Sequence, residues 1–306
     1  MQKKQKKMRL WMFVIIVLAM LLIGTVFLVY QIDKQKTDWV NTVLKNPDTT
    51  AVVAYTVNEN GELISDGSEL FLNADTPLVL ASTMKLVVLA AYESAVANGE
   101  LDPNERIAIS DIEAFYLPKT DGNAHINGLK NLGIKTDELG FALDQKETIA
   151  LDEVARIMIH YSGNVETDYL ISRLGIEKVN TAAGMDQPTS ISPILGISLA
   201  MLNHDNSFAD AKFRQKTIAD VTNGNYEYLE NLVDLYVNDP AWRQEQIEFM
   251  RSDKYIELAN SLGWEGQSAA GQLFPKGTAR DYARLMARVA SGNFISDEIS
   301  QRMQQI

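Results

Sequence analysis

A long stretch without charged residues near the N-terminus places the strongest constraint on this chain. From Leu10 to Tyr30 no residue carries a charge. As a helix at about 1.5 Å per residue, this stretch is about 31 Å long and matches a bilayer core of ~30 Å. Trp11 and Tyr30 stand at its ends, where aromatic rings favour the membrane interface. The pattern predicts one transmembrane helix over residues 10–30.

The residues before this stretch predict its orientation. Residues 1–9 hold basic residues and no acid, so they are expected to stay in the cytoplasm and to leave the rest of the chain outside. No Ala-x-Ala-like cleavage site follows Gly24, which favours an uncleaved signal-anchor over a removed signal peptide. The basic residues are Lys3, Lys4, Lys6, Lys7 and Arg9.

Composition excludes several classes of function. The formal charge of −12 would repel a phosphate backbone, so no nucleic-acid partner is expected. The absence of cysteine excludes disulfides, thiolate catalysis and cysteine-based zinc sites. His125, His160 and His204 lie far apart in the sequence, so we expect no metal site and no cofactor. The sequence leaves the oligomeric state open.

Residues 31–49 read as a linker that contains a short helix around 39–44, and residues 50–306 as the folded domain. Residues 51–57 predict a strand, Asn60-Gly61 a tight turn, and 62–65 a returning strand. The segment Ser82–Asn98 is apolar on nearly every side, so we expect a helix in the interior. Strands first and helices in the middle indicate an α+β fold with an antiparallel sheet flanked by a helical domain. Further helices are predicted over 151–160, from after the break at 161–164 to 174, and over 279–290, the last capped by Thr278.

Residues 205–272 have a polar helical pattern with breaks at Asn223-Gly224-Asn225 and Asn238-Asp239-Pro240. We interpret this segment as a helical insert. Its aromatic residues could line a ligand site, but we expect them to form the core of a small helical subdomain. These residues are Tyr226, Tyr228, Tyr236, Trp242, Phe249 and Trp264.

Ser82-Thr83-Met84-Lys85 is the S-x-x-K sequence of the chain. A spacing of three places the hydroxyl and the amine on one face of a helix. A lysine in a buried setting loses its proton more readily and can serve as a general base for a serine nucleophile. The alternative is that Ser82 only caps the helix.

Ser162-Gly163-Asn164 lies in a break between two predicted helices, where side chains can point into a cleft. The Ser162 hydroxyl could pass a proton to a leaving group, and the Asn164 amide could bind both substrate and Lys85. A plain turn is the alternative. Ser291-Gly292-Asn293 has the same pattern, but it closes a helix, where Gly-Asn is an ordinary stop.

Three segments together resemble the class A β-lactamases and penicillin-binding enzymes: Leu80–Lys85, Ile157–Val165 and Gly277–Met286. They are similar to the S-x-x-K motif, to the surroundings of the S-D-N motif with Gly163 in place of aspartate, and to the helix start before the K-T-G strand. The resemblance covers about residues 50–204 and 273–306. It implies a β-lactamase/transpeptidase-like fold, catalytic roles for Ser82, Lys85 and Ser162, and substrate binding by Asn164.

The sequence departs from that family in two places. No K-T-G follows the Thr278 helix, and Lys276-Gly277-Thr278 has the same letters in another order, so we expect a C-terminally truncated sequence without the last strands. An E-x-x-L-N match would fall on Leu199 to Asn203, where Leu199 replaces the deacylating glutamate of the family. The alternative, which we prefer, is that this segment is only a core helix after Ser192-Pro193. Glu166 is not that glutamate, because it follows Asn164 directly on the next helix.

Residues 1–30 predict a membrane anchor with the rest of the chain outside, and the resemblance implies that this extracytoplasmic part is a serine hydrolase that forms an acyl-enzyme on Ser82. The expected substrate is a β-lactam or a D-alanyl-type cell-wall compound. The departures leave two alternatives: a wall-binding or sensor pseudoenzyme of the same fold, and a glutaminase-like amidase.

Overall fold

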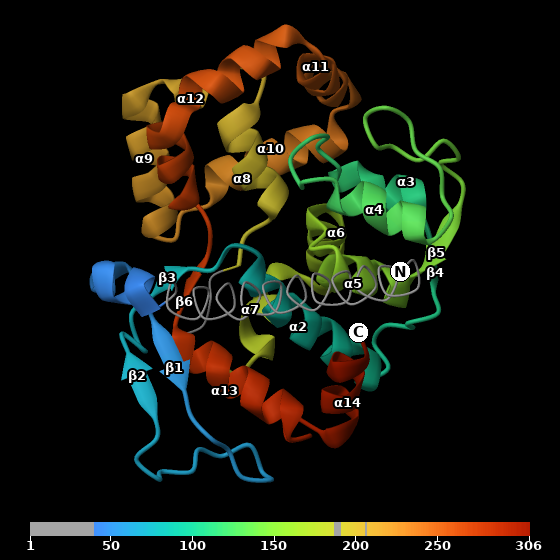
Figure 1. Ribbon diagram of the computed structural model, residues 1–306. Coiled ribbons are helices and arrows are strands. Elements are labelled where there is room, and N and C mark those ends of the chain that lie inside the picture. The colour runs from blue at the N-terminus through green and yellow to red at the C-terminus, as the bar shows by residue number, and fades with distance from the viewer. Residues whose placement is uncertain (1–39, 187–190, 206) are drawn as a thin grey trace, which may run out of the picture. The chain divides into compact units, whose positions relative to one another are not determined.

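A computed structural model describes residues 40–186, 191–205 and 207–306 (Figure 1). The chain divides into two units, residues 1–51 and 52–306. In the first, residues 40–45 are helical and a 3-10 helix follows at Pro47–Thr49, in keeping with the short helix predicted near 39–44. The predicted basic segment 1–9 and membrane span 10–30 lie outside the described residues. No helix of the described ranges is long and apolar enough to cross a membrane.

Helices make up most of the second unit (Figure 1). Those of the first half are α2 (Lys85–Ala97), α3 (Ile109–Ile112), α4 (Ala124–Asn131), α5 (Leu151–His160), α6 (Asn164–Leu174) and α7 (Ile176–Ala182). Those of the second half are α8 (Ile194–Leu202), α9 (Ala211–Thr222), α10 (Glu227–Asn238), α11 (Pro240–Arg251), α12 (Asp253–Gly271), α13 (Ala279–Ala290) and α14 (Asp297–Gln305).

The strands of the described residues pair as three separate two-stranded antiparallel sheets. The strands are antiparallel, as predicted, but the prediction of a single sheet was wrong for the described residues. The pairs are β1 (Val52–Ala54) with β2 (Leu70–Leu72), β3 (Leu78–Val79) with β6 (Lys276–Gly277), and β4 (Arg106–Ala108) with β5 (Thr148–Ala150).

The predicted hairpin forms only locally. Val57 and Leu63 make a single antiparallel bridge around the Asn60-Gly61 turn, but the partner of β1 is β2 and not residues 62–65. A second turn explains the difference, because the Asp66 carboxylate accepts the Ser68 backbone N–H at 2.9 Å. Such a local side-chain bond competes with strand pairing and ends the returning strand early.

Helix α2 lies in the interior, as its apolar sequence predicts. Nine of its residues are buried, and it packs against α5, α6, α7 and α14. Its one buried acid, Glu93, is fully inaccessible and pairs with Arg302 of α14. A helix enclosed in this way is a rigid support for the side chains of the turn at its N-terminus, Ala81–Met84.

Helices α8 to α12 form what we call the helical lobe, which has a hydrophobic cluster of its own (Figure 1). The lobe breaks where the sequence predicted: α9 ends at Thr222, and α11 begins at Pro240. Of the six aromatic residues assigned to its core, five belong to or pack against the cluster. Trp264 does not, because its side chain is 84% exposed just after a kink at Gly263.

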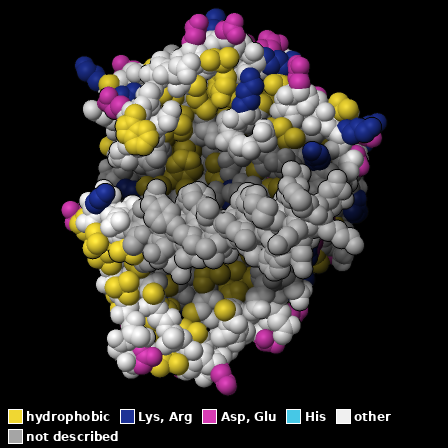
Figure 2. All heavy atoms as spheres, in the orientation of Figure 1, with side chains coloured by type: hydrophobic (Ala, Val, Ile, Leu, Met, Phe, Trp, Pro, Cys, Tyr) yellow, Lys and Arg dark blue, Asp and Glu magenta, His cyan; other side chains and the backbone are white. Residues whose placement is uncertain are grey.

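Several large hydrophobic side chains of residues 52–79, which we call the strand region because they include β1, β2 and β3, reach the surface. Figure 2 shows hydrophobic side chains there and over the helical lobe, with charged groups spread around the rim. The exposed residues of the strand region include Val57, Leu63, Ile64, Leu70, Phe71 and Val79.

Candidate active site

The turn that carries Ser82 lies between β3 and α2. It is a 3-10 helix at Ala81–Met84, and α2 continues directly from it at Lys85. The backbone of Ala81 has a φ of +44°, which is rare for a residue with a side chain and indicates local strain. The residue just before strand β6 holds the entry to this turn, since the Leu80 N–H donates to the Pro275 carbonyl at 3.0 Å. The result is an exposed Ser82 above a Lys85 that is 2% exposed.

A second strained turn carries Ser162 between α5 and α6. Its φ of +64° bends the chain sharply, so that Asn164 becomes the first residue of α6 and Gly163 precedes it as the N-cap. Helix α5 spans 151–160 as predicted, and α6 ends at Leu174 as predicted but begins at Asn164, which the sequence had assigned to the break. The Gly163 carbonyl accepts the Thr167 hydroxyl at 2.6 Å and thereby ties the turn to the first turn of α6.

The two turns bring together all four side chains singled out in the sequence. The Ser162 hydroxyl donates to Ser82 Oγ at 2.8 Å. The Lys85 Nζ lies 3.3 Å from Ser82 Oγ and 3.1 Å from Ser162 Oγ. The same nitrogen lies 2.6 Å from the Ser162 carbonyl oxygen and 2.8 Å from Asn164 Oδ1. A nucleophile, a second hydroxyl, an amine and an amide therefore share one site.

The acceptors around Lys85 determine where its lone pair can point. An ammonium has three protons, and four oxygens surround this one. The two nearest are a carbonyl and the Asn164 Oδ1, which accept hydrogen bonds and donate none. A neutral amine keeps its two protons on those oxygens, and its lone pair then faces the hydroxyls of Ser82 and Ser162. The arrangement prepares Lys85 to receive a proton from a serine.

Burial increases the fraction of Lys85 that is a neutral amine near neutral pH. Removal from water lowers the pKa of Lys85 from 10.5 to about 8, because burial disfavours the charged form. The carboxylates of Asp168, Glu166 and Asp121 act in the opposite direction and limit the fall. Asp168 is itself buried and accepts the Ile194 and Leu195 backbone N–H groups at the start of α8; burial raises its pKa to about 7.

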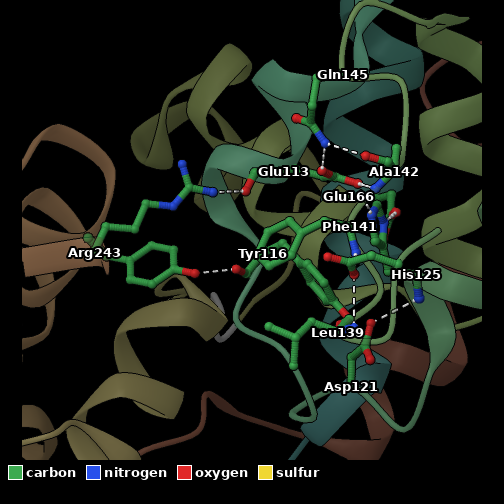
Figure 3. Close-up of polar contacts among 12 residues, drawn as sticks. Glu113, Tyr116, Asp121, His125, Leu139, Phe141, Ala142, Gln145, Glu166 and Arg243 are labelled. Atoms are coloured by element: carbon green, nitrogen blue, oxygen red, sulfur yellow. Dashed lines mark hydrogen bonds and ion pairs between the residues drawn. The ribbon is translucent and has the colours of Figure 1, made fainter. Parts of the chain in front are cut away.

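Beneath the Ser162 turn lies a buried chain of charges that the sequence did not reveal (Figure 3). His125 Nδ1 lies 2.6 Å from Glu166 Oε1, and its Nε2 lies 3.3 Å from Glu113 Oε1. Burial alone would lower the pKa of His125, but the two carboxylates outweigh it and raise the pKa to about 10. His125 is therefore an imidazolium between two acids. Glu113, His125 and Glu166 are far apart in the sequence, so no local sequence pattern indicated that they would be in contact.

Glu113 is the fixed end of this chain. Its Oε1 accepts the Ala142 backbone N–H at 2.7 Å, and its Oε2 accepts Gln145 Nε2 at 2.7 Å. Tyr116 packs its ring against His125, with ring centroids 4.7 Å apart (Figure 3). The imidazole of His125 is therefore held by two carboxylates and one aromatic ring.

The other sequence candidates have structural roles. Ser291 ends α13, its hydroxyl donates to the Arg288 carbonyl at 3.2 Å, and Gly292 follows with a φ of +77°; the second Ser-Gly-Asn is a helix stop, as predicted. Thr278 caps α13 and accepts the Asp281 backbone N–H at 3.1 Å. Leu199 is fully buried in the cluster of the helical lobe.

Comparison with known proteins identifies the family of the chain. The model of a family described as "Beta-lactamase enzyme family" matches residues 37–306. No curated protein matches. One similar solved structure is described as "Structure of PBP-A"; it is 20% identical, the matched part covers 61% of this chain and 58% of that chain, and the TM-score is 0.30. The matched part thus spans less than two thirds of that chain's length. The family model covers most of the sequence, and the chain therefore belongs to the beta-lactamase enzyme family, a family of serine hydrolases.

Proposed function

We propose that this protein is a membrane-anchored, extracytoplasmic serine hydrolase that forms an acyl-enzyme on Ser82 with a β-lactam or a D-alanyl-type cell-wall substrate. One observation carries the proposal. The exposed Ser82 hydroxyl lies within reach of a second hydroxyl and of a buried amine whose other two hydrogen-bonding directions are occupied. The anchoring rests on the uncharged stretch at residues 10–30 and the basic residues before it.

In the proposed reaction, Ser82 Oγ attacks the substrate carbonyl carbon and its proton passes to Lys85. Two routes support that transfer: a direct one over 3.3 Å, and one through Ser162 over 2.8 and 3.1 Å. Ser162 then gives a proton to the leaving nitrogen and regains one from Lys85, so that the C–N bond breaks and the acyl group stays on Ser82. The Ser82 backbone N–H would stabilise the developing oxyanion.

Asn164 has a separate part in the proposal. Lysine only donates hydrogen bonds, so the Asn164 atom that faces Lys85 is its oxygen. The amide nitrogen is then left to donate to a carbonyl of the substrate, which would orient the substrate against Ser82. The same side chain would thus position both the base and the bound molecule.

We further propose that the acyl-enzyme is long-lived. Leu199 stands where the resemblance would have the deacylating glutamate, and it is buried in the helical lobe. A leucine cannot activate a water molecule as a carboxylate does. The proposal thus favours penicillin binding or slow peptide chemistry over rapid destruction of antibiotics.

The test is an intact-mass spectrum of the full-length protein before and after incubation with a penicillin, with Ser82→Ala as the matched control. We expect a persistent adduct of one penicillin that is absent in Ser82→Ala. An unmodified protein with the penicillin consumed would contradict slow deacylation. No adduct and no consumption would overturn acylation by β-lactams, and assays of ammonia release from glutamine and of binding to cell-wall fragments would then separate the amidase from the sensor.

A further inference from the structure

The space beside Gly163 is filled by the Glu166 carboxylate. A Cβ built on Gly163 would lie 1.9 Å from Glu166 Oε2 and 2.8 Å from its Cδ. Contacts this short are forbidden, and the next nearest atom, Ile157 Cγ2, is 3.3 Å away. The φ of Gly163 is −63°, so the backbone conformation itself does not require glycine. What requires glycine at position 163 is the carboxylate of Glu166.

Glu166 is unusual in being both fully buried and incompletely satisfied. One oxygen, Oε1, meets His125 Nδ1 at 2.6 Å. The other, Oε2, is buried against Gly163 and has no hydrogen-bond partner within the described residues. Glu166 is the third residue of α6, where the unpaired N–H groups of the first turn favour a negative charge. The Glu166 carboxylate thus lies directly behind the Ser162–Asn164 turn, with His125 on its other side.

This placement connects the buried charges to the proposed active site. The turn backed by Glu166 supplies two of the acceptors of the Lys85 amine, the Ser162 carbonyl and Asn164 Oδ1. The S-D-N motif that the turn resembles has an aspartate where Gly163 stands. Here position 163 has no side chain, and the Glu166 carboxylate, one turn further along the helix, fills the space beside it.

We infer that Glu166, held by His125 and Glu113, is a positioning residue that fixes the Ser162–Asn164 turn and the charge state of Lys85 in place of an acid at position 163. The inference rests on the proposed function of Ser82 and Lys85. The charged groups that face Lys85 are Asp168, Glu166 and Asp121, and Glu166 is the one that touches the turn.

The test compares four variants of the full-length protein. Glu166→Gln keeps the shape and removes the charge. Gly163→Ala introduces the short contact with Glu166 Oε2. Gly163→Asp combined with Glu166→Ala moves the carboxylate to position 163, and Gly163→Ala combined with Glu166→Ala relieves the contact without restoring a charge.

The first measurement needs no substrate. The titration of the Lys85 side chain is followed by NMR of its Cε carbon in lysine-labelled protein, with the resonance assigned from Lys85→Arg. Loss of a nearby negative charge lowers the pKa of an amine, so we expect the midpoint to fall by roughly 0.5 to 1 pH unit in Glu166→Gln. The His125 ring is titrated in the same samples. This shows whether a shift of the Lys85 midpoint comes from the lost Glu166 charge or from a change in the charge of His125.

The double variants decide between positioning and mere packing. We expect Gly163→Asp with Glu166→Ala to return the Lys85 midpoint toward that of the wild type, and Gly163→Ala with Glu166→Ala to leave it low. Acylation by a fluorescent penicillin should fall about 100-fold in Gly163→Ala, the cost typical of a misplaced catalytic group, and recover most fully in the variant that carries the aspartate.

An unchanged Lys85 midpoint in Glu166→Gln, or equal midpoints in the two double variants, would overturn the inference and leave Glu166 with a packing role alone. If wild-type protein takes up no penicillin, the proposed function fails, but the Lys85 titration still decides this inference. The two failures are therefore distinguishable.

Discussion

The ionisation of Lys85 gives acylation of Ser82 a distinctive dependence on pH. Burial lowers the pKa of Lys85 to about 8, so roughly a tenth of the amine is neutral at pH 7 and roughly nine tenths at pH 9. If the neutral amine is the base, the rate constant rises about tenfold over that interval and then levels off. An amine with the ordinary pKa of 10.5 would give a rise of about 100-fold from pH 7 to pH 9 and no plateau below pH 10.

The assay is the rate of labelling of the full-length protein by a fluorescent penicillin from pH 6 to pH 10, corrected with Ser82→Ala for non-enzymatic reaction. Lys85→Arg is the matched variant, because a guanidinium keeps its charge throughout this range and cannot take up a proton. We expect its rate to fall by about 100- to 10,000-fold and to lose the rise between pH 7 and pH 9.

Two results would refute this reasoning. A wild-type rate that is constant from pH 6 to pH 10 would mean that Lys85 does not act as the base. A rate that still rises tenfold per unit above pH 9 would mean that burial does not lower the pKa of Lys85 in the way that its surroundings imply.

Two further predictions concern stability. Burial raises the pKa of Glu93 to about 7 even though Arg302 opposes the rise. Arg302→Met should therefore cost about 3 kcal/mol of unfolding free energy at pH 8, where wild-type Glu93 is charged and paired, and much less at pH 5, where wild-type Glu93 has already taken up a proton. Urea unfolding at pH 5 and pH 8 measures the loss of unfolding free energy. Combining Arg302→Met with Glu93→Gln should abolish the difference between the two pH values. Equal losses in Arg302→Met at pH 5 and pH 8 would contradict the prediction. Tyr236→Phe removes the hydrogen bond from its hydroxyl to the Tyr116 carbonyl and should cost about 1 to 3 kcal/mol, measured as a lower thermal midpoint; an unchanged midpoint would show that this contact adds nothing.

Local signals in the sequence were sufficient for the helices that carry the site. The break at residues 161–163 and the apolar character of Ser82–Asn98 are properties of neighbouring residues, and both appear where expected. The position of Lys85 beside Ser82 follows from helical spacing alone. The approach of Ser162 and Asn164 to Lys85 does not, because it joins segments about 80 residues apart; the sequence offered it as one interpretation beside a plain turn, and the family resemblance favoured it.

The features that the sequence did not predict depend on contacts over long distances in the chain. Strand β1 pairs with β2 because of the Asp66 turn, a competition that residue propensities do not resolve. The link from His125 to Glu166 joins α4 to α6, and neither residue has a pattern around it that indicates a partner. Trp264 is exposed since the kink at Gly263 turns it away from the cluster that its neighbours fill.

Two of the hydrogen bonds that join the helical lobe to the rest of the domain constrain their donor and acceptor positions unequally. The Tyr236 hydroxyl donates to the Tyr116 carbonyl, and Arg243 Nη2 donates to the Glu113 carbonyl. In both cases the lobe contributes a particular side chain, whereas the other side contributes only main chain, which every residue type possesses. A change of side chain at residue 116 leaves the carbonyl acceptor in place, whereas a change at Tyr236 or Arg243 removes the donor. Related sequences should therefore drift faster at residue 116 than at residue 236, unless the Tyr116 ring is itself selected for its contact with His125.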